Sequence, residues 1–567
     1  MRKITIMAGP LRMVSLSALV ATLLFVGNVG TALAWTPGTF SSTDEQLLAD
    51  LTTADRAGAS LFPLTIDSYL HSEAEWRAKD MSDRDYFAHE IPPNGTTVFD
   101  DWTADGYCFK AGGENIGTSS YGDGTATTRI NDAFMASKDG HREIILGRWT
   151  NVGFGAYKRA SDGQKYYVEL FSVPCNYVLP STYTPITPTR VYDSRSPVNL
   201  LHSHTKRTFQ VTGLAGIPAN ATAVTGNLTV TGQTAAGYVA LSSGGSLSTG
   251  HQPTFSTNNF PLGDTRANDV TVPLSLDGQL DAMYWTAYTS DTTHIIFDVT
   301  GYYMNNYAAA DFNAITPAVV LNTNTGLGLT GPFVSHTKRT FDLSALSAIP
   351  SNAVAVAGNL IVNGQTRAGY VTVSSGGSLT TGTQPTTSTD NFPLSDTRSN
   401  GIVVVLGPNK SLDAMYWTAY VSDTAQVTFE VTGYFLASGL ASDDGVYHPL
   451  AAPSRILDSR NGPGGVFHSQ ILQTLSLGGS ASGIAGNLTV TNQTRAGFVS
   501  IEPDLTNGIA PTTHTLNFPT ADTRAIGTTV GTTGTGGADI MYWTTVTSDT
   551  TDVIFDESGY FGPVSNP

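Results

Sequence analysis

The stretch DAMYWTAYTSDTTHIIFDVTGYY, residues 281–303, decides the fold class of most of this 567-residue chain. Asp281–Tyr288 is rich in aromatic residues and predicts a strand. Thr289–Thr293 is a polar turn, and His294–Tyr303 predicts the return strand. The stretch therefore predicts antiparallel β structure.

Motifs from this stretch and its surroundings occur three times. They are Asn-Leu at Asn227, Asn359 and Asn487, Asp-Thr-Arg at Asp264, Asp396 and Asp522, and Met-Tyr-Trp at Met283, Met415 and Met541. Successive Asp-Thr-Arg motifs lie 132 and 126 residues apart, which is enough for each unit to form a domain. A further strand pair is predicted at Ala223–Thr231 and Gly237–Ser243. We predict three all-β antiparallel units, each a sandwich or a barrel. Their expected bounds are 189–304, 313–436 and 448–562.

The first 34 residues have the pattern of a secretory signal peptide. A basic region with Arg2, Lys3 and Arg12 precedes an apolar stretch, and Ala32-Leu33-Ala34 fits a cleavage site. No later segment has the roughly 18 consecutive apolar residues of a membrane span. We therefore expect a secreted protein, extracellular or held at the cell surface, with no transmembrane span after residues 1–34 are removed.

The charge composition narrows the choice of partner. The chain has 29 Lys and Arg against 46 Asp and Glu, a formal net charge of −17. A nucleic-acid binder needs a basic surface, so the acidic balance argues against nucleic acid as a partner. Two cysteines are too few for a disulfide scaffold.

Residues 41–177 differ from the rest of the chain. Apolar residues recur there at helical spacing, which predicts helices. These helices cover 43–57, 67–81 and 127–137. The sequence KYYVELFSV at Lys165–Val173 predicts a buried strand, so this part is expected to be a mixed α+β domain. The Pro-containing run 178–188 predicts a linker to the β units.

Three motifs of this domain carry the side chains best suited to chemistry. They are Tyr86-Phe87-Ala88-His89, Gly113-Glu114-Asn115-Ile116 and Gly140-His141-Arg142-Glu143. Two imidazoles and a carboxylate can bind a divalent metal and leave a position for water, or act as acid and base on a substrate. Sequence spacing leaves open whether His89, Glu114 and His141 converge, and structural histidines in loops are the alternative.

In this order, the three motifs resemble the CAP superfamily of cysteine-rich secretory proteins, antigen 5 and pathogenesis-related proteins, also called the SCP domain, in its bacterial type. The likeness runs from about Glu45 to Cys175. It includes Gly106-Tyr107 before the second motif and Asn151-Val152-Gly153-Phe154-Gly155 after the third. The resemblance implies an α-β-α sandwich with a large central cleft.

The resemblance also implies a site in that cleft. In the family, two His and two Glu line the cleft and can hold a divalent cation, zinc or calcium. His89, Glu114 and His141 match three of these positions, with the two histidines as the expected metal ligands. The fourth position, a Glu, falls near Ser137, where this sequence has no Glu. Glu143 and Glu169 lie in the neighbouring motifs, and the sequence leaves open whether either compensates.

Both cysteines, Cys108 and Cys175, lie in the CAP-like domain. An exported protein meets an oxidising environment, so we expect a disulfide between them, with two free thiols as the alternative.

The β units resemble repeat domains at the C-terminus of exported proteins of actinobacteria and similar bacteria, a module without a settled function. The likeness includes the opening motif Arg190–Arg195, which returns at Arg455–Arg460 but is Val319–Asn324 in the middle unit. Loss of both charges there favours a structural ion pair over a binding site. Trp285, Trp417 and Trp543 are candidates for an aromatic platform that packs on sugar rings, because alternation along a strand puts each on the opposite face from its Tyr neighbour. A core residue on a buried strand is the alternative.

Three classes of function follow. The leading hypothesis is an exported CAP-domain protein that acts by extracellular binding, with the β units as display or adhesion modules for a cell-surface, cell-wall or matrix component. A metal-assisted hydrolase centred on His89, Glu114 and His141 is one alternative, and a carrier of a sterol or other apolar ligand is another. No Ser-His-Asp or Cys-His arrangement is recognisable, so an enzyme is not the leading hypothesis. The sequence leaves the ligand, the oligomeric state and the arrangement of the β units open.

Overall fold

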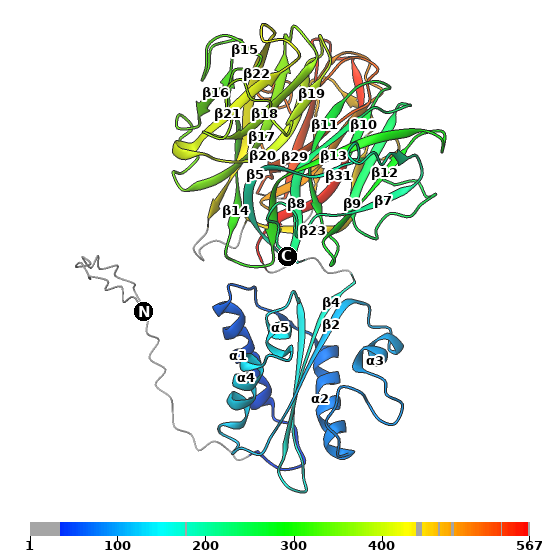
Figure 1. Cartoon of the computed structure of the whole chain (residues 1–567), viewed down its shortest axis with the longest axis vertical. Helices are drawn as coiled ribbons and strands as arrows, with labels where there is room; N and C mark the ends of the chain where they lie inside the picture. The colour runs from blue at the N-terminus through cyan, green and yellow to red at the C-terminus, as the bar shows by residue number, and fades with distance from the viewer. Residues whose placement is uncertain are drawn as a thin grey trace, which may run out of the picture.

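The computed structural model describes residues 35–175, 179–437, 445–462, 465–477, 481–534 and 536–564. An N-terminal α/β domain lies below a larger β body in Figure 1. The predicted signal peptide, 1–34, lies outside the described residues. Within those residues, no helix has the length and apolar character needed to cross a membrane.

The N-terminal domain is a four-stranded sheet, of order β1-β3-β4-β2, with helices on both faces. Its strands are β1 (Thr65–Ile66), β2 (Phe109–Ser119), β3 (Asn151–Lys158) and β4 (Lys165–Pro174). Its helices are α1 (Ser42–Gly58), α2 (Ser68–Asp83), α3 (Val98–Ala104), α4 (Ala126–Ala136) and α5 (His141–Ile145). Helices α1, α4 and α5 cover one face, and α2 and α3 the other (Figure 1). This is the α-β-α arrangement that the resemblance implied.

Alternation along β4 divides the interior of this domain into two cores. Tyr167 and Phe171 pack with α1, α4 and α5, whereas Tyr166, Val168 and Leu170 pack with α2 and α3. A strand covered on both faces is apolar at nearly every position, which explains the continuous run that predicted β4. The three predicted helices are confirmed as α1, α2 and α4, each within two residues of its expected bounds.

Strand β3 has glycine where it faces α2. A Cβ atom at Gly153 would lie 2.1 Å from the carbonyl carbon of Leu70, and one at Gly155 would lie 2.2 Å from the carbonyl oxygen of Ala74. The backbone of α2 therefore packs directly on β3, and the two glycines set its distance from the sheet.

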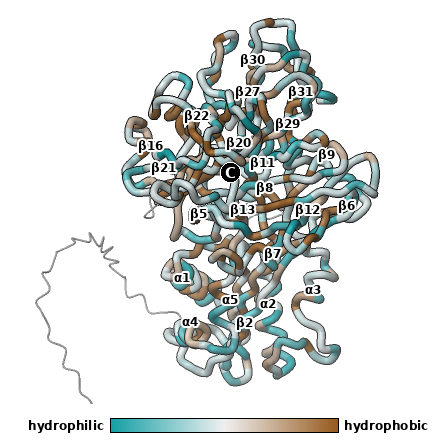
Figure 2. Tube along the Cα trace, turned by 45° about the horizontal axis from the view of Figure 1, so that its top comes forward, coloured by the Kyte–Doolittle hydropathy of each residue, from teal (hydrophilic) through white to brown (hydrophobic). Residues whose placement is uncertain are grey.

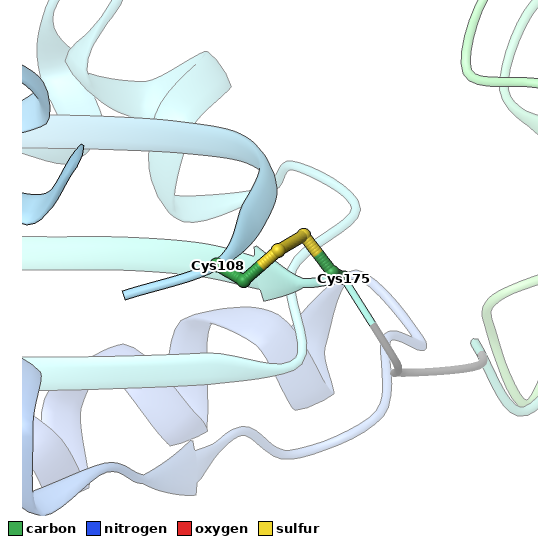
Figure 3. The surroundings of a disulfide bond; sticks show 2 residues. All are labelled: Cys108 and Cys175. Carbon is green, nitrogen blue, oxygen red and sulfur yellow. A yellow bond between two sulfur atoms is a disulfide. The ribbon is translucent and has the colours of Figure 1, made fainter. Parts of the chain in front are cut away.

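Cys108 and Cys175 form a disulfide, as predicted, with their Cα atoms 5.3 Å apart. The bond joins the residues beside the start of β2 and the end of β4 (Figure 3). It closes the domain at the side from which the chain continues toward the β body.

The β body consists of three β sandwiches, each with its own apolar core. The first contains β5 (Thr182–Asp193), β6 (Leu201–His202), β7 (Lys206–Gln210), β8 (Ala221–Thr231), β9 (Gly237–Ser243), β10 (Asn258–Phe260), β11 (Arg266–Pro273), β12 (Gln279–Trp285) and β13 (Thr292–Met304). The second contains β14 (Ala310–Asn322), β15 (Phe333–Val334), β16 (Arg339–Asp342), β17 (Ala353–Asn363), β18 (Gly369–Ser375), β19 (Asp390–Phe392), β20 (Arg398–Val405), a 3-10 turn (Pro408–Lys410), β21 (Ser411–Trp417) and β22 (Thr424–Ala437). The third contains β23 (Val446–Asp458), β24 (Phe467–His468), β25 (Leu472–Ser476), β26 (Gly483–Thr491), β27 (Gly497–Glu502), β28 (Leu516–Phe518), β29 (Arg524–Gly531), β30 (Gly537–Trp543) and β31 (Thr550–Gly562).

Strand order is alike in the three sandwiches. Each has one four-stranded sheet, with orders β10-β9-β12-β7, β19-β18-β21-β16 and β28-β27-β30-β25. The longer strands of the first two sandwiches join into one ten-stranded sheet through β5 and β14, and those of the third form a five-stranded sheet. Figure 2 shows hydrophobic segments along strands such as β13, β20 and β29.

The predicted strands are present, but the predicted pairing between them is wrong. β12 pairs with β7 and β9, whereas β13, the expected return strand, pairs with β5 and β8 in the opposite sheet. β8 and β9 are likewise in different sheets. The chain crosses between the sheets at these turns, so that Tyr284 of β12 and Phe297 of β13 share one core. This pairing resolves the choice between sandwich and barrel in favour of the sandwich.

The predicted linker, 178–188, is wrong over most of its length, because β5 begins at Thr182. Pro185 and Pro188 lie where the register between β5 and β13 shifts, and such a bulge is a position where a strand tolerates proline. β14 and β23 also begin before the predicted bounds of their units, at Ala310 and Val446.

The three sandwiches pack against one another through a central aromatic core. It contains Tyr183, Tyr303, Phe312, Phe435, Tyr447 and Phe561. The ring centroids of Tyr183 and Phe435 are 4.4 Å apart, and those of Tyr303 and Tyr447 are 4.5 Å apart. Strands of different sandwiches therefore bury aromatic surface against one another.

The recurring Asp-Thr-Arg motif closes the three sandwiches into a cycle, which we call the Arg-Asp ring. Each arginine, with its side chain 2% exposed, pairs with the aspartate of its own motif and with that of another sandwich. The pairs between sandwiches are Arg266–Asp522 at 2.9 Å, Arg398–Asp264 at 2.9 Å and Arg524–Asp396 at 3.0 Å. Every sandwich is thus linked to both of the others.

Asp390, next to this ring, makes the stability of the β body depend on pH. Burial raises its pKa to about 8, and neither carboxylate oxygen has a hydrogen-bond partner among the described residues. The folded state therefore holds a proton that the unfolded chain loses above about pH 4, so this contribution to stability falls as pH rises from about 4 to about 8. In the first sandwich, Asn258 stands in the corresponding place before Asn-Phe-Pro and donates to the carbonyl of Arg266 at 3.0 Å.

We expect Asp390→Asn to stabilise the protein at pH 8.5 by about 2–4 kcal/mol and to change stability little at pH 5. Thermal unfolding of the variant and the parent protein between pH 5 and 8.5 measures this difference. An equal effect at both pH values would show that Asp390 does not titrate in this range.

Candidate functional site

The site begins with Arg77, a charged residue on the apolar face of α2. Its side chain is fully buried, and Nε donates to Glu114 Oε1 at 2.9 Å. The guanidinium group also donates to the Tyr86 hydroxyl and to the carbonyls of Ala88 and His89. Arg77 therefore fixes both Glu114 and the loop that carries His89.

Glu114 connects this buried cation to the first histidine. It lies in β2 with its side chain 4% exposed, and its Oε2 is 2.6 Å from Nδ1 of His89. The His89 side chain is 55% exposed. Because Nδ1 is engaged by the carboxylate, the ring is oriented and presents Nε2 to solvent.

His141 is the first residue of α5, and its ring is held on two sides. Nδ1 is 3.0 Å from the hydroxyl of Ser137, and the ring stacks on Phe134 with centroids 5.1 Å apart. Burial lowers the pKa of His141, and the nearby His89 lowers it further. The imidazole is therefore neutral at pH 7, with one nitrogen that donates and one that accepts.

The structure brings the three predicted residues into one region. Glu114 and His89 are in direct contact. The next residue of β2, Asn115, donates to the carbonyl of His141 at 3.2 Å, which attaches the start of α5 to the strand. His89 lies close enough to His141 to lower the pKa of His141.

Neither nearby glutamate replaces the missing fourth residue. Ser137 occupies that part of the chain and bonds to His141. Glu169 is fully buried behind Asn115, where it accepts from Asn115 at 2.9 Å and from Thr52 at 3.0 Å, and burial raises its pKa to about 7. Glu143 is exposed to solvent.

This donor set does not fit a catalytic zinc, which takes three protein ligands. Both carboxylate oxygens of Glu114 are already occupied, one by Arg77 and one by His89. Only the Nε2 atoms of His89 and His141 remain without a hydrogen-bond partner among the described residues. We therefore derive no metal-dependent step at these residues.

The three tryptophans are half-buried, and each Tyr before them is buried. Trp285 stacks on His204 and Trp417 on His336, both with centroids 3.6 Å apart. One face of each of these indoles is therefore covered. An aromatic platform for sugars stays a prediction.

The side chains of the opening motif form ion pairs within the β body. Arg190 pairs with Asp298 and Arg455 with Asp556, both at 2.8 Å, and both aspartates are buried. In the middle sandwich the buried acid is Glu430, which accepts from the backbone N–H of His514 instead of from an arginine. Burial raises the pKa of Glu430 to about 8. These contacts agree with a structural role for the motif.

Residues 49–177 match the sequence model of the CAP family, described as the cysteine-rich secretory protein family. This region is a CAP domain. Uncharacterized protein YkwD of Bacillus subtilis (strain 168) is 34% identical to the chain over 118 residues, which are 21% of this chain and 44% of that relative. The chain thus spans less than half of the relative's length.

Two solved structures are also similar to part of the chain. One is an extracellular protein containing a SCP domain from Bacillus anthracis str. Ames, with 28% identity and a TM-score of 0.20, covering 23% of this chain and 40% of that one. The other is an outer surface protein from Borrelia burgdorferi, with 21% identity and a TM-score of 0.22, covering 24% of this chain and 98% of that one. These relatives are thus bacterial proteins, and two are described as extracellular or outer surface proteins.

Arg77 is a residue of the candidate site that the sequence analysis missed. Its signal was present, since it lies three residues after Ala74 and one before Ala78, both of which are fully buried. A charged residue at a buried position of a helix is rare unless it is paired. That position therefore predicts a partner such as Glu114.

Proposed function

We propose that the protein acts outside the cell by binding a ligand in the cleft of its CAP domain, and that the β body presents this domain at a surface. The observation that carries the proposal is the pair of oriented imidazoles. His89 and His141 each use Nδ1 for an internal hydrogen bond, which leaves both Nε2 atoms available to a ligand. Ring nitrogens of this kind recognise hydroxyl and carboxylate groups.

The geometry favours binding over catalysis. His141 contacts the Ser137 hydroxyl, but no described carboxylate bonds to its Nε2, so the third member of a Ser-His-Asp triad is missing. Glu114 is held between Arg77 and His89, where it orients an imidazole. An extracellular place is supported by the disulfide, which is typical of exported proteins, and by the match to a family of secretory proteins.

Insoluble peptidoglycan is a suitable probe because it carries both sugar hydroxyls and peptide carboxylates. We expect the full chain to sediment with it and the His89→Ala/His141→Ala double variant to lose at least tenfold in bound fraction. His251→Ala, which changes an exposed histidine of the β body, is the matched control and is expected to bind like the parent. Equal sedimentation of the double variant and the parent would place binding outside the cleft and overturn the proposal.

A carrier of an apolar ligand is the second candidate, favoured by a cavity between the CAP domain and the β body. Its volume is about 350 Å³, in the range of small-molecule sites. Apolar lining residues come from both sides and include Val173, Leu179, Leu274, Leu276 and Leu450. Saturable binding of a fluorescent fatty acid or sterol, weakened by Leu274→Asp, would support this function. The metal-assisted hydrolase stays a prediction, and it requires the parent protein to bind more zinc than the His89→Ala/His141→Ala variant does.

A further inference from the structure

A second group of ligating side chains lies in the CAP domain away from the cleft. Glu45, His71 and Glu75 each place one ligand atom within 4.8 Å of the others. Glu45 belongs to the first turn of α1. His71 and Glu75 lie four residues apart on α2, which puts them on the same face of that helix.

The group lies over one edge of the sheet, where helices from opposite faces meet. β1 covers the β3 edge only at Asn151 and Val152, and the segment before α1 covers it further on, with Ser41 N donating to Ala156 O. Glu45 Oε1 accepts from the N–H of Ala156 at 3.1 Å, which fixes Glu45 to β3. Gly155, the preceding residue of β3, brings the backbone of α2 next to the same point.

The charges of this group are not balanced by protein cations. Among the described residues, no Lys or Arg forms a salt bridge with Glu45 or Glu75, although Glu45 is only 5% exposed. Nδ1 of His71 is buried and has no hydrogen-bond partner in the same part of the chain. Two carboxylates and an unpartnered ring nitrogen in this setting favour a bound cation.

We propose that Glu45, His71 and Glu75 bind one divalent transition-metal ion, with Zn²⁺ as the best match, and that this ion ties α1 to α2 across the sheet edge. Zinc accepts imidazole nitrogen and carboxylate oxygen at about 2.0–2.2 Å, which places tetrahedral ligands about 3.4 Å apart. Rotation about the terminal bonds of the glutamates covers the difference from the observed spacing. Calcium and magnesium prefer sets made of oxygen alone. The site goes beyond the proposed function because it shares no residue with the cleft.

Zinc titration of the full chain tests this assignment. The His89→Ala/His141→Ala variant is the background, so that the cleft histidines cannot contribute. We expect calorimetry to give one equivalent of bound Zn²⁺ and a higher Tm for the CAP domain in its presence. Adding His71→Ala is expected to weaken zinc binding at least 100-fold and to abolish the rise in Tm. Adding His251→Ala instead is the matched control and is expected to change neither.

A second measurement keeps the test decisive if the His71 variant unfolds. Co²⁺ added to the same background is expected to give visible absorption of a four-coordinate site, which excess Zn²⁺ removes. Glu75→Gln, which keeps the shape of the side chain, is expected to weaken both ions. Unchanged zinc affinity in the His71 or Glu75 variants would overturn the site, as would the absence of one bound equivalent in the background. Equal affinity for Ca²⁺ or Mg²⁺ would overturn the choice of metal class.

Discussion

The variant Arg398→Met is expected to destabilise the β body by about 3–5 kcal/mol, the cost of removing one partner from a buried ion pair. Arg398 contacts Asp264 of the first sandwich and Asp396 of its own, with 2% of its side chain exposed. Without the Arg398 guanidinium group, the Arg-Asp ring keeps three aspartates but only two arginines to pair with them. Asp390, whose strongest attraction to a positive charge is also to Arg398, adds a further buried acid to the same region.

Differential scanning calorimetry measures this loss, and Arg495→Met is the matched control. Arg495 pairs with Asp549 at 2.6 Å, but its side chain is 52% exposed, and such pairs contribute only about 0–1 kcal/mol. The transition of the β body is therefore expected to shift far more for Arg398→Met. Similar shifts in the two variants would mean that the ring is not a principal contact between sandwiches.

Gly153→Ala is expected to destabilise the CAP domain by about 3 kcal/mol and to weaken ligand binding at the cleft. The new Cβ would lie 2.1 Å from the backbone of Leu70, so that α2 has to move away from β3. Arg77 moves with α2, and its bonds to Glu114 and to the His89 loop lengthen in consequence.

The matched control for this variant is Gly122→Ala, because a Cβ at Gly122 meets no atom within 4 Å. Thermal unfolding of the full chain and sedimentation with peptidoglycan report the two effects separately. If Gly153→Ala has the same Tm and the same bound fraction as Gly122→Ala, the close packing of α2 on β3 does not hold the cleft.

The α/β domain was predictable because its segments are strongly patterned. Apolar residues at helical spacing predict a helix, and a short run that is apolar throughout predicts a buried strand. The structure has the predicted elements as α1, α2, α4 and β4. The cleft residues were predictable only as an ordered set of motifs. Local pattern carries no information on whether His89, Glu114 and His141, which are separated by α3, β2 and α4, converge.

The β body was harder to predict, although its strands were recognised. An aromatic strand and the strand after it read as a hairpin, but β12 and β13 belong to different sheets. The local sequence shows that a strand is covered on both faces. Which neighbouring strand it hydrogen-bonds to depends on the packing of the whole sandwich. The Asp-Thr-Arg triplet was visible as a repeat, yet its partners lie more than 100 residues away in other sandwiches.

The Glu45, His71 and Glu75 group was missed for a related reason. His71 and Glu75 have the spacing of one helix face, but Glu45 belongs to another helix on the opposite side of the sheet. Only the packing of both helices at the edge of β3 brings the three together.

Closure of the Arg-Asp ring has a consequence for resistance to proteases. In a linear row of modules, the two outermost modules each have an unshared face, and fraying and digestion by proteases begin there. Here the last sandwich holds the first through Asp522 and through Asn487, which donates to the carbonyl of Ser256. A peptide bond cut between two sandwiches would leave both fragments bound to their neighbours, so a nicked β body would stay assembled and keep its CAP domain attached.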